Sequence, residues 1–152
     1  MGVLPWSPLK SGCLSGRYRR GQADPADTRR SAVLGRPGEA QFTVIEALAA
    51  VAAEVGASPA AVALSWVQHR PGVSSTLIGP RTLGHLESNL AGLDVELTAE
   101  QTATLNEVSA PVLNLPYDLN QQVGRMLKYA GATVDGVAGP VYPPLLQSTA
   151  RY

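Results

Sequence analysis

Cysteine, aromatic side chains and net charge are all scarce in this chain of 152 residues. Its single cysteine, Cys13, excludes a disulfide within the chain, and the first residues lack the charged, apolar and small-residue order of a secretory signal. We therefore expect a reducing, cytoplasmic environment. The formal net charge is zero, which gives no electrostatic reason to expect nucleic acid or a membrane as a partner. No apolar run approaches the roughly 18 residues that a membrane-spanning helix needs.

The charges that are present cancel overall but are unevenly placed. Residues 1–40 carry seven basic and three acidic side chains, a net charge of +4, and the remaining residues carry −4. An arginine-rich segment without matching acids is either a solvated surface or a binding site for an anion, because the planar guanidinium group fits a phosphate. The composition alone leaves both interpretations open.

Hydrophobic periodicity and turn residues predict that strands alternate with helices. Ser58 and Thr98 are typical N-cap residues, Gln101 completes a capping box with Thr98, and Gly56 is placed to end a helix. The predicted order is a strand at 2–6, a loop at 7–38, helices beginning near 41 and at 59, a strand at 76–78, and helices capped by Thr82 and Thr98. Two apolar strands separated by helices favour a parallel sheet, but two such strands do not make a stable sheet alone.

The last part of the chain differs in composition from the rest. After Ser109 the sequence has scattered proline and glycine, and only residues 119–130 could form a helical turn or two. We expect this part to be a wrapping segment or a loosely ordered one.

The two predicted strands both run into turns that could bind an anion. The first is followed by WSPLKSGCLSG, and the second by a glycine and an arginine, Gly79 and Arg81, at the start of a helix. Ligands of parallel α/β folds bind at the carboxyl ends of strands, and helix N-termini favour phosphate. For each residue alone the simpler interpretation is structural: Gly79 as a turn residue and Arg81 as a surface charge. Their closeness at the junction of a strand and a helix favours an anion-binding site. The chain has neither a P-loop motif nor a G-x-G-x-x-G motif.

Four further side chains are of types that can act in catalysis or ligand binding, but we expect them to have structural roles. We expect Tyr18 and Trp66 to pack in the interior and Cys13 to act as a small apolar residue. His69 stands at a helix end, where a histidine commonly interacts with helix carbonyls.

Three segments match one known family in order and spacing over residues 2–110. They are PWSPLKSGCLSGRY, AAVALSWVQHRPGVSSTLIGPRTLGHLESNLAGL and LTAEQTATLNEVS. Together they resemble the last part of an aldo-keto reductase, a family of NADPH-dependent oxidoreductases of aldehydes and ketones. The resemblance implies an α/β fold: a partial (β/α)8 TIM barrel, with C-terminal strands 7 and 8 and their helices in residues 1–109, and a proline- and glycine-rich wrapping tail in residues 110–152. Because such a barrel needs about 250 residues, we expect the chain to form only part of one.

The resemblance also implies a set of NADPH-binding residues, namely Ser7, Pro8, Leu9, Gly12, Arg17, Arg29, Gly79, Arg81, His85 and Asn89. The first four would line the nicotinamide-to-pyrophosphate side of the cofactor, and Arg17 and Arg29 would lie over the pyrophosphate. Gly79 and Arg81 would meet the 2′-phosphate, and the last two would contact the adenine, although the family commonly has glutamine at the position of His85.

No metal ligand and no catalytic residue is assigned in this chain. The aspartate, tyrosine, lysine and histidine of the family's chemistry come from earlier barrel strands, so we expect the chain by itself to be inactive. Its expected partners are NADPH and either a missing N-terminal barrel portion or a second copy of the chain.

Two alternatives to an aldo-keto reductase portion remain open at this stage. One is a non-catalytic nucleotide- or partner-binding module that self-associates through open sheet edges. The other is a non-functional remnant that does not fold.

Overall fold

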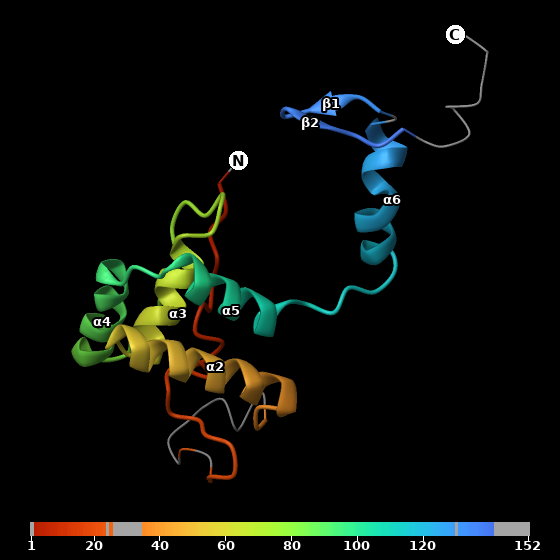
Figure 1. The fold of residues 1–152 in the computed structure, drawn as a ribbon. Coiled ribbons are helices and arrows are strands. Elements are labelled where there is room, and N and C mark those ends of the chain that lie inside the picture. The colour runs from red at the N-terminus through yellow and green to blue at the C-terminus, as the bar shows by residue number, and fades with distance from the viewer. Residues whose placement is uncertain (1, 24, 26–34, 130, 142–152) are drawn as a thin grey trace, which may run out of the picture. The chain divides into compact units, whose positions relative to one another are not determined.

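The structure is a computed structural model that describes residues 2–23, 25, 35–129 and 131–141 (Figure 1). The chain divides into two compact units, Met1–Ala110 and Pro111–Tyr152. The candidate site lies in the first unit.

The core of the first unit forms where helix α2 (Glu39–Val55) packs against α3 (Pro59–Gln68) and α5 (Ala99–Ser109). Its buried side chains are Leu48, Val51, Ala52, Ala61, Val62, Ala63, Val95 and Leu105. The short link between α2 and α3 has the predicted chemistry. Gly56 adopts the left-handed conformation with φ 71°, and the Ser58 hydroxyl accepts a hydrogen bond of 3.1 Å from the Ala61 N–H. Both signals are local, which explains why the sequence predicts them well.

Helix α4 (Leu83–Leu90) and the 3₁₀ turn η1 (Ala91–Asp94) follow, and both pack against α3. Gly92 makes the close approach of η1 possible, because a Cβ at this position would lie 2.9 Å from the carbonyl oxygen of Ala61. The caps of α4 and α5 are the predicted ones: Thr82 accepts from the His85 N–H, and Thr98 forms a capping box with Gln101.

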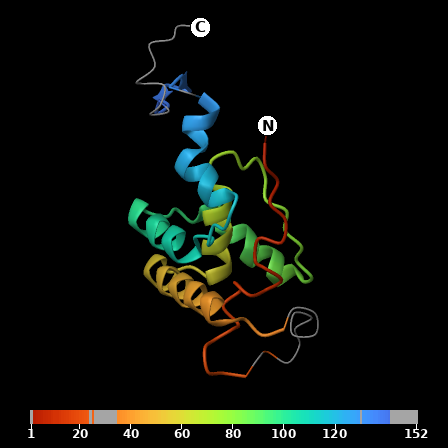
Figure 2. The ribbon, with the colours of Figure 1, turned by 90° about the vertical axis from the view of Figure 1, so that its right-hand side faces the viewer.

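The two predicted strands lie side by side in parallel, but they pair only at isolated positions. Val3 bridges Val73, and Trp6 bridges Leu77 (Figures 1 and 2). The Val3 N–H donates to the Gly72 carbonyl at 2.8 Å, and the Leu77 N–H donates to the Pro5 carbonyl at 2.9 Å. The prediction of two continuous strands at 2–6 and 76–78 was therefore wrong in extent. Two short strands without further sheet partners among the described residues have little to hold a regular ladder.

The apolar positions of α4 are only partly covered, since Leu86 is half-buried. No residue of this helix is fully buried, and Leu83 and Leu90 are exposed together with Val3, Leu4, Trp6 and Leu77 of the bridged segments. Within the described part of the chain, nothing covers these apolar side chains.

The second unit contains helix α6 (Tyr117–Tyr129) and a hairpin of β1 (Thr133–Val134) and β2 (Val137–Ala138). The helix is longer than the predicted turn or two, and the hairpin was not predicted. A signal for it was present in the sequence, because Asp-Gly is a typical two-residue hairpin turn. In the structure, Asp135 and Gly136 have the positive φ values of 51° and 74° that such a turn requires.

No single helix among the described residues is long and apolar enough to cross a membrane. Helices α2 and α3 together have the length and composition of a membrane span, but the chain bends by 96° between them.

Candidate functional site

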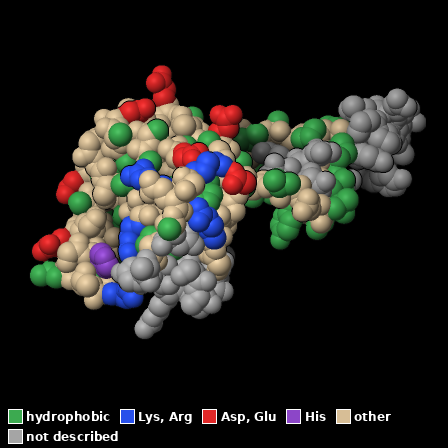
Figure 3. All heavy atoms as spheres, turned by 90° about the horizontal axis from the view of Figure 1, so that it is seen from below, with side chains coloured by type: hydrophobic (Ala, Val, Ile, Leu, Met, Phe, Trp, Pro, Cys, Tyr) green, Lys and Arg blue, Asp and Glu red, His purple; other side chains and the backbone are tan. Residues whose placement is uncertain are grey.

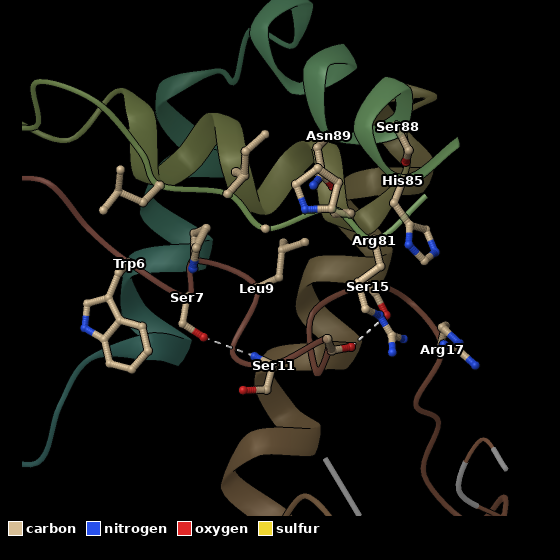
Figure 4. Close-up of a pocket in the computed structure, with 17 residues that line it drawn as sticks. Trp6, Ser7, Leu9, Ser11, Ser15, Arg17, Arg81, His85, Ser88 and Asn89 are labelled. Carbon is tan, nitrogen blue, oxygen red and sulfur yellow. Dashed lines mark hydrogen bonds between the residues drawn. The ribbon is translucent and has the colours of Figure 1, made fainter. Parts of the chain in front are cut away.

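A pocket of about 950 Å³ opens where the loop after the first bridged segment meets the turn after the second (Figure 4). Ala60 of α3 also lines the pocket, and α4 contributes His85, Ser88 and Asn89. The lining residues are Trp6, Ser7, Pro8, Leu9, Ser11, Gly12, Ser15, Arg17, Ala60, Leu77, Ile78, Gly79, Pro80, Arg81, His85, Ser88 and Asn89.

Nine of the ten residues expected to hold a cofactor line this one pocket. They are Ser7, Pro8, Leu9, Gly12, Arg17, Gly79, Arg81, His85 and Asn89. The tenth, Arg29, lies outside the described residues. The fold thus brings together two segments that are far apart in the sequence, and their role in binding stays a prediction.

The loop that forms the first wall is tightly wound. Ser7, Lys10 and Ser11 have positive φ values of 53°, 48° and 54°, a conformation that costs a residue with a side chain about 1–2 kcal/mol. The Lys10 N–H donates to the Ser7 carbonyl at 2.8 Å, and the Ser11 N–H approaches the Ser7 hydroxyl at 3.3 Å. Backbone strain of this kind persists where the surrounding structure enforces it and is concentrated at binding sites.

Packing beneath the loop holds it in this strained conformation. The Cys13 side chain is buried with Tyr18 against Phe42 and Ile45 of α2. Gly16 has a φ of 84°, and a Cβ there would lie 2.9 Å from Cγ of Pro59. Only glycine allows the loop to turn at this position so close to the start of α3.

The second wall begins with the turn at residues 79–81 and continues along α4. The Thr82 hydroxyl accepts a hydrogen bond of 3.2 Å from the His85 N–H, which fixes the first turn of the helix. Helix N-termini carry N–H groups without intrahelical partners and a partial positive charge, both of which favour an anion. Figure 4 shows Arg81, His85, Ser88 and Asn89 together on this wall.

The charged side chains that line the pocket are both basic. They are Arg17 and Arg81, and no Asp or Glu among the described residues lines it. On the face seen in Figure 3, a histidine lies beside Lys and Arg side chains. No cluster of His, Cys, Asp and Glu that could hold a metal ion occurs in the described part of the chain. The arrangement therefore suits a phosphate or another anion.

Not every arginine of the basic N-terminal segment is available for this purpose. Arg20 forms ion pairs with Glu39 and Glu46 of α2, and its Nε lies 2.8 Å from Oε1 of Glu46. This hydrogen bond lowers the pKa of Glu46 from its ordinary value. The guanidinium group also lies 5.6 Å from the centre of the Phe42 ring. The sequence left open whether the basic segment is a solvated surface or an anion site, and Arg20 belongs to neither, because it pairs with acids of α2. A charge count along the sequence does not show such pairing with a helix.

The structure confirms structural roles for the four side chains that were expected to have them. Tyr18 and Cys13 are buried. The Trp66 indole packs against the core and donates from Nε1 to the Asn106 side chain at 3.0 Å. Nδ1 of His69 lies 2.9 Å from the Ser65 carbonyl oxygen of α3, as its place at the helix end indicated.

Sequence reasoning missed Trp6 as a lining residue. Its side chain is 81% exposed, although it ends an apolar run and bridges Leu77. An aromatic residue directly before a serine- and glycine-rich loop was the available signal. Ser11, Ser15 and Ser88 also line the pocket, and no pattern in the sequence points to them specifically.

Comparison with known proteins places these features in one family. The family model of the aldo/keto reductase family matches residues 1–110. The chain is 30% identical over 108 residues to the uncharacterized oxidoreductase YrpG of Bacillus subtilis (strain 168), a match that covers 71% of this chain and 32% of that protein. It is 34% identical over 109 residues to the protein tas of Escherichia coli (strain K12), covering 70% and 31% of the two chains.

A solved structure shares the fold. The glycerol dehydrogenase AKR11B4 from Gluconobacter oxydans aligns with a TM-score of 0.59 and 24% sequence identity, over 76% of this chain and 37% of that chain. The chain spans about a third of the length of the curated relatives that it matches. From the match over residues 1–110, the chain belongs to the aldo/keto reductase family.

Proposed function

We propose that the chain is the C-terminal, cofactor-binding portion of an NADPH-dependent aldo-keto reductase, an enzyme that reduces carbonyl groups or oxidises alcohols. The two bridged segments would be strands 7 and 8 of its (β/α)8 barrel. The observation that supports this proposal most strongly is the convergence of nine expected ligand residues on one pocket, in which Arg17 and Arg81 are the charged lining residues among those described.

The chemistry of the lining fits a phosphorylated dinucleotide. Arg81 and the N-terminus of α4 would bind the 2′-phosphate, since a guanidinium group and free N–H groups suit a dianion. Arg17 would bind the pyrophosphate, and Asn89 would donate to or accept from the adenine. The strained loop from Ser7 to Gly12 would lie along the nicotinamide end. A volume of about 950 Å³ is at the upper end of the range for ligand pockets.

The role of this chain is to hold and orient the cofactor. When bound, NADPH supplies a hydride for carbonyl reduction. No proton donor is assigned among the residues of this chain, so the catalytic tyrosine and its neighbours would come from the rest of the barrel, in the same polypeptide or in another. A reducing, cytoplasmic location agrees with the single cysteine, Cys13, whose thiol is buried and not part of a disulfide within the chain.

The exposed apolar side chains support a partner for this portion. Val3, Leu4 and Leu77 lie on or beside the bridged segments, where a further strand on either edge would cover them. The remaining barrel strands would supply that cover.

A second candidate function rests on the same exposed edges. A non-catalytic nucleotide-binding module could close them by pairing with a second copy of itself. Sedimentation of the purified chain distinguishes the two, because self-association through these edges predicts a dimer whose fraction rises with concentration. A monomer that binds nucleotide supports the barrel portion instead.

Binding of NADPH and NADH to matched variants tests the main proposal. We expect Arg81→Ala to weaken NADPH about ten- to hundredfold, which corresponds to roughly 1.5–3 kcal/mol for a charge-assisted contact, and to leave NADH nearly unchanged, because NADH lacks the 2′-phosphate. Arg19→Ala is the control, since Arg19 is exposed and does not line the pocket, so it removes the same charge without removing a ligand. Equal weakening of both cofactors by Arg81→Ala, or no binding of NADPH by the unchanged chain, would contradict the proposal.

A further inference from the structure

Two arginines that lie close together in the sequence face different parts of the first unit. Arg17 lines the pocket (Figure 4). Arg20 does not line it and instead forms ion pairs with Glu39 and Glu46 of α2. Residues 17–19 belong to no helix or strand, so contacts of the neighbouring residues must hold the backbone at this point.

Packing fixes the chain directly before and after Arg17. Gly16 lies so close to the start of α3 that a Cβ there would be 2.9 Å from Cγ of Pro59. Tyr18 is buried in a cluster with Phe42 of α2. These contacts hold one residue on each side of Arg17, and the path of the chain beyond Tyr18 depends on further contacts.

Arg20 supplies the next contact, and its geometry is that of an anchor on α2. Its Nε lies 2.8 Å from Oε1 of Glu46, and its Nη2 lies 3.2 Å from Oε2 of the same carboxylate. The guanidinium group also lies 5.6 Å from the centre of the Phe42 ring. A single exposed ion pair contributes little, but two-point contact with a carboxylate and an aromatic face together fix the orientation of an arginine.

A second arginine ties the same stretch of chain to the same ring. The Arg36 guanidinium group lies 5.4 Å from the centre of the Phe42 ring, and its Nη2 donates a hydrogen bond of 2.8 Å to the Gln22 carbonyl. The chain that follows the pocket loop is therefore attached to α2 at Arg20 and again at Gln22.

We propose that Arg20 is a positioning residue, which fastens the chain to Glu46 and so holds Arg17 in the orientation that binds the pyrophosphate of the cofactor. This inference rests on the proposed function, because it takes the role of Arg17 from it. Ordering a long side chain and its loop on binding costs free energy, and contacts that restrict them beforehand lower this cost. Arg20 touches no ligand, so its effect on affinity must pass through Arg17.

A double-mutant cycle on the 152-residue chain tests this dependence. Dissociation constants for NADPH would be measured calorimetrically for the unchanged chain, Arg17→Ala, Arg20→Met and the double variant. We expect Arg17→Ala to weaken binding about tenfold and Arg20→Met about three- to fivefold. The double variant should bind as Arg17→Ala does, because the side chain that Arg20 positions is already absent.

Two further variants and a second probe complete the experiment. Glu46→Gln removes the charge that holds Arg20 and should also weaken NADPH. Arg70→Met is the matched control, since Arg70 lies 4.1 Å from the centre of the Trp66 ring and does not line the pocket; it should leave NADPH binding unchanged. Adenosine 2′-monophosphate has no pyrophosphate, so Arg20→Met should not change its dissociation constant.

The same loss from Arg20→Met with and without Arg17 would overturn the inference, because a purely structural role acts in both backgrounds. No loss of NADPH affinity in Arg20→Met, or an equal loss for adenosine 2′-monophosphate, would also overturn it. In those cases the proposed function stands if Arg17→Ala and Arg81→Ala still weaken NADPH. If the unchanged chain binds neither NADPH nor adenosine 2′-monophosphate, both are wrong.

Discussion

The substitution Gly92→Ala tests whether the close packing of η1 on α3 stabilises the fold of the first unit. An alanine Cβ at this position would lie 2.9 Å from the Ala61 carbonyl oxygen and 3.1 Å from Cβ of Leu64. Real Cβ atoms do not approach a backbone oxygen so closely, so η1 or α3 must move. Forcing an extra methyl group into a packed interface costs about 1–3 kcal/mol.

Gly84→Ala is the matched control for this change. Gly84 lies in α4, and a Cβ there would meet nothing within 4 Å. In a helix, alanine is more favourable than glycine by about 0.5–1 kcal/mol, because the unfolded chain loses less conformational freedom. The same chemical change should thus have opposite signs at two positions eight residues apart in the chain.

Urea unfolding followed by circular dichroism measures both effects. With a denaturant dependence of about 1–3 kcal/mol per molar, Gly92→Ala should lower the midpoint by roughly 1 M, and Gly84→Ala should leave it unchanged or raise it slightly. An unchanged midpoint for Gly92→Ala would refute the packing argument. A similar loss for both variants would show that glycine matters for its backbone conformation and not for its lack of a side chain.

Two further predictions concern the pocket mouth and the ion pairs of α2. Trp6→Ala should change the free energy of unfolding by less than about 0.5 kcal/mol, because the side chain is exposed, yet weaken NADPH measurably; Trp66→Ala, which removes a packed and hydrogen-bonded indole, should cost about 2–4 kcal/mol of stability. A lower free energy of unfolding for Trp6→Ala than for Trp66→Ala would contradict this prediction. Arg20 lowers the pKa of Glu46, so their pairing stabilises the fold above the carboxyl range and is lost as the pH falls through it. Unfolding midpoints between about pH 6 and 3 should therefore fall less steeply in Arg20→Met than in the unchanged chain, and parallel pH profiles would contradict that role.

The local features of the fold could be predicted from the sequence. Gly56, Ser58 and the capping box of Thr98 mark the observed helix ends, because each signal acts over a few residues of the chain. Helix α2 begins at Glu39, two residues before the predicted start, and helix ends vary by that much.

Features that depend on distant partners could not be predicted in the same way. The bridged segments pair only at Val3 with Val73 and Trp6 with Leu77, because the length of a ladder depends on neighbouring strands. The apolar pattern of α4 predicted a buried face, yet Leu83 is largely exposed. Periodicity shows that a helix has an apolar side but not which other part of the protein covers it.

The candidate site was predictable to the extent that it follows from strand-end turns and from family resemblance. The turn chemistry alone singled out the loop after Trp6 and the pair Gly79 and Arg81. The pairing of Arg20 with acids on α2 was not accessible, since it joins a loop to a helix through side chains. Trp6 was missed because an aromatic at a strand end is usually part of a core.

The most direct test of the account is to map NADPH binding residue by residue on the ¹⁵N-labelled chain by NMR. If the pocket is the cofactor site, saturable changes in chemical shift should be concentrated in residues 7–17 and 79–89. Adenosine 2′,5′-bisphosphate, which carries the 2′-phosphate without the nicotinamide, should reproduce the changes near Arg81 and His85. Changes confined to other surfaces, or none at NADPH concentrations in the millimolar range, would show that these residues do not form a working cofactor site in this chain.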